Sequence, residues 1–156
     1  GSLNTGTHTG TLWTSSGQLL ATATFTGESA SGWQQMNFTA PVAIAADTTY
    51  VASYHTTSGR YSVSRPYFTS QYVNGPLTAL ANGAEEGNGV YTYGASNSFP
   101  RSTYQASNYW VDVSITFSAG SVRRSLRPSS GEASERDGRS QQCGPCGLVR
   151  RADRGV

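Results

Sequence analysis

Aromatic side chains are the residues of this sequence best suited to forming a binding surface. The chain has 3 Trp, 9 Tyr and 5 Phe, and all of them lie at or before Phe117. Sugar rings stack their C–H faces on exposed aromatic rings, while amide, carboxylate and guanidinium groups bind the sugar hydroxyls. Because Trp and Tyr also pack in hydrophobic cores and cross-strand pairs, a structural role competes with a binding role for each ring.

Trp110 is the aromatic residue that the sequence most favours for binding. Apolar and polar residues alternate through Tyr109–Phe117, which predicts a strand with its aliphatic face buried. Trp110 and Asp112 would then lie together on the opposite face, where Asp112 could supply a polar contact. We predict these ligand-binding residues: Trp110, Asp112, Tyr67, Tyr91, Tyr93 and Tyr104.

The sequence shows no recognisable catalytic motif. It contains two histidines, His8 and His55. Neither a G-x-S-x-G nor an H-E-x-x-H motif is present, and these motifs position a nucleophile or two zinc ligands. A hydrogen-bonded or exposed strand residue is the simpler interpretation of each histidine, so we predict that the protein is not an enzyme.

Two short motifs carry residues that bind metals or form disulfides. Glu85 and Glu86 lie in a Gly-rich loop, and calcium takes about six to eight oxygen ligands from such loops, although the spacing is not that of an EF-hand. Cys143-Gly-Pro-Cys146 has the spacing of a redox motif, but no strand or helix is predicted around it. One such pair is only half of a structural zinc site. We predict no cofactor and no metal, with calcium at Glu85 and Glu86 as the alternative.

Charge and composition divide the chain near Ser118. Residues 1–118 contain three arginines and five acidic residues, whereas residues 119–156 contain eight arginines, four acidic residues and no aromatic residue. A segment so poor in apolar residues cannot offset the entropy cost of ordering. We therefore predict a folded module over 1–118 and a disordered tail over 119–156. The tail is either a natural extension or the out-of-frame product of a GC-rich gene.

Charge and hydropathy also argue against two classes of partner. The formal net charge of +2 is too small to indicate nucleic-acid binding. No apolar run approaches the ~18 residues that a membrane-spanning helix needs. We predict neither a nucleic-acid partner nor a membrane partner.

Alternating residues predict short β-strands throughout residues 1–118. No window has the i, i+3, i+4, i+7 spacing of an amphipathic helix, and Ser15-Ser16-Gly17 has the composition of a hairpin turn. This pattern predicts an all-β, antiparallel sandwich of jelly-roll or immunoglobulin-like type. Besides Tyr109–Phe117, strands are predicted over Thr9–Thr14, Gln18–Phe25, Trp33–Phe38, Tyr50–His55, Arg60–Ser64 and Val90–Tyr93.

Several ordered motifs carry a resemblance to a known family. They are Thr7-His-Thr-Gly-Thr-Leu-Trp13, Gly32-Trp33, Thr49-Tyr-Val-Ala-Ser-Tyr-His55, Asn74-Gly-Pro-Leu77, Gly89-Val-Tyr-Thr-Tyr-Gly94, Phe99-Pro and Ser107-Asn-Tyr-Trp-Val-Asp-Val113. Together they resemble a bacterial family called domain of unknown function 4082, from about Asn4 to Phe117. The resemblance implies a β-sandwich without a defined activity, often repeated, in large secreted or surface-displayed proteins. It also implies further strands before the first motif, so we expect this module to lack its first strands.

Residues and resemblance together predict a function. We expect a non-catalytic accessory module of a secreted bacterial multidomain protein that binds a glycan or cell-surface polymer. Its other partners would be the neighbouring domains of a larger chain. A passive structural spacer without a ligand is the alternative.

Overall fold

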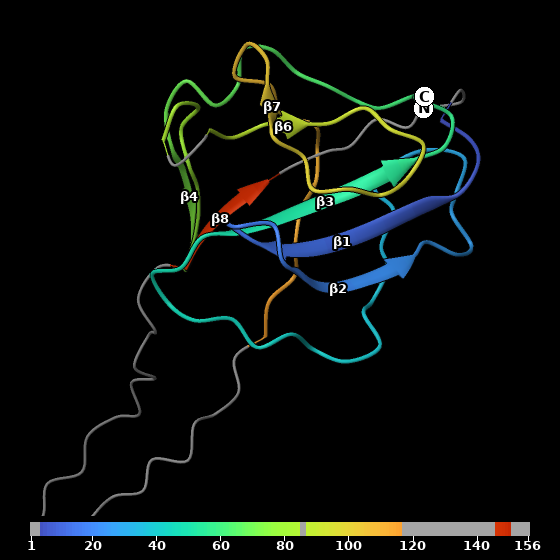
Figure 1. The fold of residues 1–156 in the computed structure, drawn as a ribbon, viewed down its shortest axis with the longest axis horizontal. Helices are drawn as coiled ribbons and strands as arrows, with labels where there is room; N and C mark the ends of the chain where they lie inside the picture. Colours follow the sequence, from blue (N-terminus) through green and yellow to red (C-terminus); the bar gives the residue numbers. More distant parts are fainter. Residues whose placement is uncertain (1–3, 85–86, 117–145, 151–156) are drawn as a thin grey trace, which may run out of the picture.

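The described part of the chain is built from β-strands and long connecting loops. The structure is a computed structural model that describes residues 4–84 and 87–116 and the backbone of 146–150, none of which is helical. Its strands are β1 (His8–Thr14), β2 (Leu19–Thr24), β3 (Tyr50–Thr56), β4 (Tyr72–Asn74), β5 (Leu77–Ala79), β6 (Val90–Tyr91), β7 (Ser102–Thr103) and β8 (Cys146–Arg150) (Figure 1).

Six of these strands form one sheet, in the order β2-β1-β3-β8-β5-β4, and β6 pairs with β7 in a second one. Figure 1 shows β1, β2 and β3 side by side, with β6 and β7 set apart from them. β1 pairs antiparallel with β2 and β3, and β4 with β5, whereas β8 runs parallel to both of its neighbours. The predicted all-β class is confirmed, and the sandwich type stays a prediction.

The predicted hairpin between β1 and β2 is confirmed. The strands join through a tight turn in which the Gly17 N–H donates to the Thr14 carbonyl at 3.1 Å. Gly17 has a φ of 91°, a conformation that glycine adopts without strain. The turn therefore forms where the Ser-Ser-Gly composition places it.

The core lies on both faces of β1 and β3. Leu12 on β1 packs with Tyr50 and Ala52 on β3, whereas Trp13 and Val51 form a separate buried cluster. Successive residues of a strand point to opposite faces, so both faces of this strand pair are covered. Residues from the loops complete the two clusters: Phe38, Val42, Ile44, Val111 and Val113 on the first, and Leu80 and Phe99 on the second.

The strand predicted over Tyr109–Phe117 is wrong as a hydrogen-bonded strand, although its burial pattern is right. Tyr109 is buried and Val111, Val113 and Ile115 are half-buried, while the residues between them are exposed. No ladder forms in the described part of this segment, and Asn108 makes only an isolated bridge with Ser64. Trp110 has a φ of 56°, which interrupts the extended backbone that a ladder requires at the start of this segment.

Two other strand predictions are also wrong. Trp33–Phe38 forms no strand, and within Arg60–Ser64 only Ser64 takes part in a bridge. In the first of these segments the Gln34 side chain bonds back to its own loop, so the segment is fixed by local contacts. The short strands β4, β5 and β7 were not predicted, because two or three residues are too few to show a pattern.

Within residues 119–156, which the sequence predicts to be a disordered tail, Cys146–Arg150 forms β8, and the division into module and tail stays a prediction. This strand lies between β3 and β5, and Leu148, Val149 and Arg150 pair with Tyr50–Ala52. The backbone groups of β3 and β5 that face β8 need hydrogen-bond partners, and a short strand supplies them whatever its composition. The other residues of the predicted tail, including Cys143, lie outside the described residues.

A glycine links the loop before β6 to the segment that carries Trp110. Gly89 has a φ of 66°, and a Cβ there would overlap the carbonyl oxygen of Ser107. We predict that Gly89→Ala lowers the free energy of unfolding by more than ~3 kcal/mol, because overpacking adds to the cost of a positive φ. Urea unfolding followed by circular dichroism measures this loss.

Gly83→Ala is the matched control for that experiment. Gly83 also has a positive φ, 96°, but a Cβ there meets nothing within 4 Å. This variant should lose only ~1 kcal/mol, the cost of the conformation alone. Equal losses in the two variants would contradict the close approach of Gly89 to Ser107.

Candidate functional site

Three exposed aromatic rings from three different loops lie in contact. Trp110 is the middle one: its ring centroid is 6.3 Å from that of Trp33 and 5.5 Å from that of Tyr67, both edge-on. The exposed fractions are 64% for Trp33, 41% for Tyr67 and 36% for Trp110. We call these three residues the aromatic ridge. Tyr67 also packs edge-on against Phe68, a core residue, so the ridge is anchored to the interior.

Trp110 is held in place by its backbone as well as by its ring. Its N–H donates to Oδ1 of Asn108 at 2.8 Å, and its indole Nε1–H donates to Oγ of Ser64 at 3.2 Å. Asn108 is fully buried and pairs with Ser64 through the bridge described above. A positive φ at a bulky residue is uncommon and persists where the surroundings impose it. The orientation of Trp110 is therefore imposed by these contacts.

A polar groove of about 160 Å³ begins at Trp110 and extends to the first residue of β1. Hydroxyl, amide and carboxylate groups make up most of its wall, so it is suited to a ligand with many hydrogen-bonding groups. The lining residues are Asn4, His8, Phe25, Glu28, Ser29, Ala30, Ser31, Gly32, Gln34, Tyr54, Ser62, Tyr109 and Trp110.

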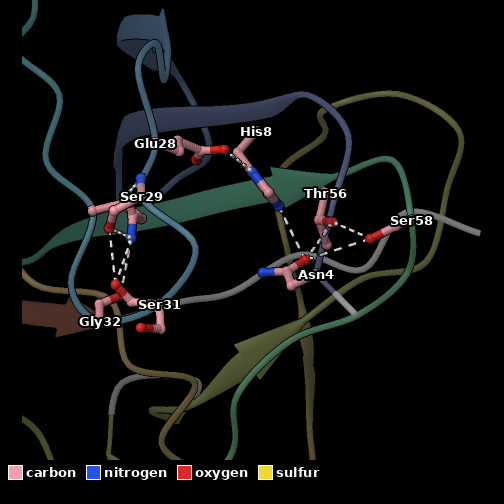
Figure 2. Close-up of polar contacts among 9 residues, drawn as sticks. Asn4, His8, Glu28, Ser29, Ser31, Gly32, Thr56 and Ser58 are labelled. Atoms are coloured by element: carbon pink, nitrogen blue, oxygen red, sulfur yellow. Dashed lines mark hydrogen bonds and ion pairs between the residues drawn. The ribbon is translucent and has the colours of Figure 1, made fainter. Parts of the chain in front are cut away.

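His8 connects the N-terminal segment to the loop after β2. Its Nδ1 lies 2.7 Å from Oε2 of Glu28, and its Nε2 lies 3.0 Å from Oδ1 of Asn4. Thr56 at the end of β3 donates to the same Asn4 oxygen at 3.1 Å. Figure 2 shows His8 between these two partners. Because both ring nitrogens are engaged within the protein, this arrangement holds Glu28 at the groove wall.

Gln34 organises the loop that precedes Trp33. Its Oε1 accepts the Ser29 N–H at 2.8 Å, and its Nε2 donates to Oγ of Ser29 at 2.9 Å and to the Gly32 carbonyl at 3.2 Å. All of these contacts lie within six residues of chain, from Ser29 to Gln34. The side chain thus closes the loop on itself and positions Trp33 for contact with Trp110.

The structure brings only part of the predicted site together. Trp110 and Tyr67 are in contact, whereas Tyr104 lies under the guanidinium of Arg65, whose Cζ is 5.1 Å from the ring centroid. Tyr91 and Tyr93 instead form a second group, 5.3 Å apart. Through Tyr91 this group contacts Tyr109, which lines the groove, but it shares none of the ridge's ring contacts among the described residues.

Asp112 is exposed but does not line the groove, and its Oδ1 accepts the N–H of Val113 at 2.8 Å. Sequence reasoning missed Trp33, Glu28, Gln34 and Asn4 as site residues. One signal was present: Ser29, Ser31 and Gly32 make a small polar loop just before a tryptophan.

The described residues hold no group of three or more His, Cys, Asp or Glu side chains close enough to share a metal ion. Glu85 and Glu86, the calcium alternative, lie outside the described residues. The same described residues also include no helix long and apolar enough to cross a membrane.

Two tyrosines in the groove wall have shifted ionisation. Burial raises the pKa of Tyr54 to about 12, opposed by a hydrogen bond from the backbone of Ser62 and assisted by Tyr109. Burial also raises the pKa of Tyr109, against a hydrogen bond with Ser107 and the positive charge of Arg65. Both hydroxyls are therefore neutral around pH 7.

The raised pKa of Tyr54 predicts a loss of stability at alkaline pH. Between pH 10 and 12 the tyrosine ionises in the unfolded chain but stays neutral in the fold, so ionisation favours unfolding. The wild type should lose roughly 2 kcal/mol more than Tyr54→Phe across this interval, since each pKa unit is worth ~1.4 kcal/mol. Urea unfolding at several pH values measures the two curves, and parallel curves would contradict the prediction.

The role of Gln34 is tested by comparing it with its neighbour. Gln34→Ala should lower the free energy of unfolding by ~1–2 kcal/mol, because several hydrogen bonds of ~0.5–1.5 kcal/mol each are lost. It should also speed proteolysis within Gly27–Trp33. Gln35→Ala is the control, because Gln35 is exposed and has none of these contacts. If both variants behave like the wild type, Gln34 does not order the loop.

Comparison with known proteins identifies the family. A family model described as Domain of unknown function (DUF4082) matches residues 1–111, a span that includes the ridge and every groove-lining residue. No curated protein and no solved structure matches the chain. The family suggested by the sequence motifs is confirmed, and because the model covers most of the 156 residues, this protein belongs to the DUF4082 family.

Proposed function

We propose that this protein is a non-catalytic accessory module that binds a glycan or another cell-surface polymer. The observation that carries the proposal is the aromatic ridge: three exposed rings in mutual contact beside a polar groove. Sugar chains are recognised by this combination, because their C–H faces stack on rings while their hydroxyls need hydrogen-bond partners.

The exposure of the ridge is itself informative. Trp33 contacts Trp110 yet keeps 64% of its surface in water. Soluble monomeric domains seldom leave contiguous large apolar patches uncovered unless the patch contacts a partner. The ridge is also held at a strained backbone position and by a dedicated loop, which costs stability that core packing alone would not require.

The setting of the module is proposed from the family resemblance. We place it in a secreted or surface-displayed bacterial multidomain protein, among neighbouring domains of the same chain. A sandwich arrangement would suit this role, and the burial of both Leu12 and Trp13 on opposite faces of β1 supports it. A rigid β-module can hold a polymer outside the cell on its ridge, while neighbouring domains of the same chain carry out their own functions.

The proposal predicts a binding loss on truncation of the central ring. The full chain should be retained by at least one polysaccharide in affinity electrophoresis, and Trp110→Ala should weaken retention at least about tenfold, as for a central contact residue. The fold should survive, because this side chain is 36% exposed. Thermal melting by circular dichroism checks the fold.

Tyr72→Ala is the control for the ridge. Tyr72 is 54% exposed on β4, and none of the described ring contacts involves it. This variant should bind like the wild type. If the wild type is retained by no polysaccharide at all, the passive spacer is the better description of the protein.

A further inference from the structure

The polar side chains that line the groove next to the ridge indicate the charge of the glycan that would bind there. We propose that the site binds an uncharged polysaccharide, with one sugar unit in the groove hydrogen-bonded to the Glu28 carboxylate and the following units stacked on the aromatic ridge. This inference rests on the proposed function, and it adds the charge class of the ligand and the residue that selects it.

Among the residues that the structure describes, none of those lining the groove is a side chain that recognises an acidic sugar. Carboxylate and sulfate groups are bound by arginine forks or lysine ammonium groups. The chain contains no lysine. Arg60, Arg65 and Arg101, the arginines of the described residues before the tail, do not line the groove. Arg65 instead stacks over Tyr104, and Arg101 over Phe99.

Glu28 is the carboxylate that faces the groove. Its side chain is 24% exposed and its Oε2 lies 2.7 Å from Nδ1 of His8, the only partner of Glu28 among the described residues. Figure 2 shows one carboxylate oxygen turned toward His8. A carboxylate offers about four acceptor sites, so most of them remain for sugar hydroxyls. An acidic sugar would instead bring a like charge to this partly buried group.

For a cationic glycan, the groove offers a single carboxylate among polar groups that are otherwise neutral. The Glu28 carboxylate is the only acidic side chain among the described lining residues, and its Oε2 is bonded to Nδ1 of His8. The other polar groups of the wall are uncharged: the amides of Asn4 and Gln34 and the hydroxyls of serines and Tyr54. Neutral donors and acceptors of this kind fit a hydroxyl-rich, uncharged ring.

The size and position of the groove place one sugar unit in it. Its volume of about 160 Å³ is below the ~300 Å³ at which pockets for drug-sized ligands begin. Trp110 both lines the groove and forms the centre of the ridge. A chain with one unit in the groove would therefore continue across Trp110 toward Trp33 or Tyr67.

Affinity electrophoresis of the full chain tests the charge class. Gels would contain uncharged polymers (a β-glucan, a galactomannan, a glucomannan), acidic ones (polygalacturonate, alginate) or cationic chitosan, at about 50 and 500 mM NaCl. We expect retention by an uncharged polymer, changed less than twofold by salt because no charge pair forms with the ligand. Trp110→Ala should abolish this retention.

Glu28→Gln tests whether the Glu28 carboxylate binds the sugar unit in the groove. Retention by the uncharged polymer should fall about tenfold, since a hydrogen bond to a charged acceptor becomes a neutral one. Asp47→Asn is the control, because Asp47 is an exposed carboxylate that does not line the groove. A folded Glu28→Gln variant that binds like the wild type would overturn the inference. The polymer panel tests the wild type and so does not depend on the folding of this variant.

The outcomes separate this inference from the proposed function. Retention only by acidic polymers or only by chitosan, lost in Trp110→Ala, would overturn the uncharged class and leave glycan binding in place. Retention by none of the polymers would remove the proposed function itself.

Discussion

The antiparallel pairing of β1 with β3 is the constraint on which the rest of the structure depends. The two strands match residue for residue, from His8 opposite Thr56 to Thr14 opposite Tyr50. This register places Leu12 beside Ala52 on one face and Trp13 beside Val51 on the other. Because each face of the pair packs against its own set of residues, a one-residue slip would move Leu12 or Trp13 to the opposite face and disrupt both clusters.

The candidate site lies at one end of this strand pair but is built from loops. His8 and Thr56 mark that end, and Asn4 bonds to both of them. From there, Glu28 and Gln34 order the loop that carries Trp33. On the other side, buried Asn108 sets the direction of Trp110. The strands supply a rigid base. Side-chain hydrogen bonds fix the loop residues of the site, as ladder hydrogen bonds fix the residues of a strand.

The site also shows how one residue can serve structure and recognition together. Tyr109 is buried against Tyr61 and Tyr91, while the next residue, Trp110, is exposed and has a positive φ. A regular strand would also alternate in this way, but the turned backbone frees the Trp110 N–H for Asn108. Alternation thus places a core ring beside an exposed one, and the positive φ adds the hydrogen bond to Asn108 that fixes Trp110.

Local pattern in the sequence was enough for the β1–β2 hairpin, for β3 and for the burial alternation of Tyr109–Thr116, because each depends on period-2 hydrophobicity or turn composition. The motifs also sufficed to recognise the family. Tertiary structure alone decided that Tyr109–Thr116 covers the core without joining a ladder and that Cys146–Arg150 pairs between β3 and β5. It also decided that Trp33, Tyr67 and Trp110 meet. These outcomes depend on contacts between segments far apart in the chain, and no local periodicity encodes such contacts.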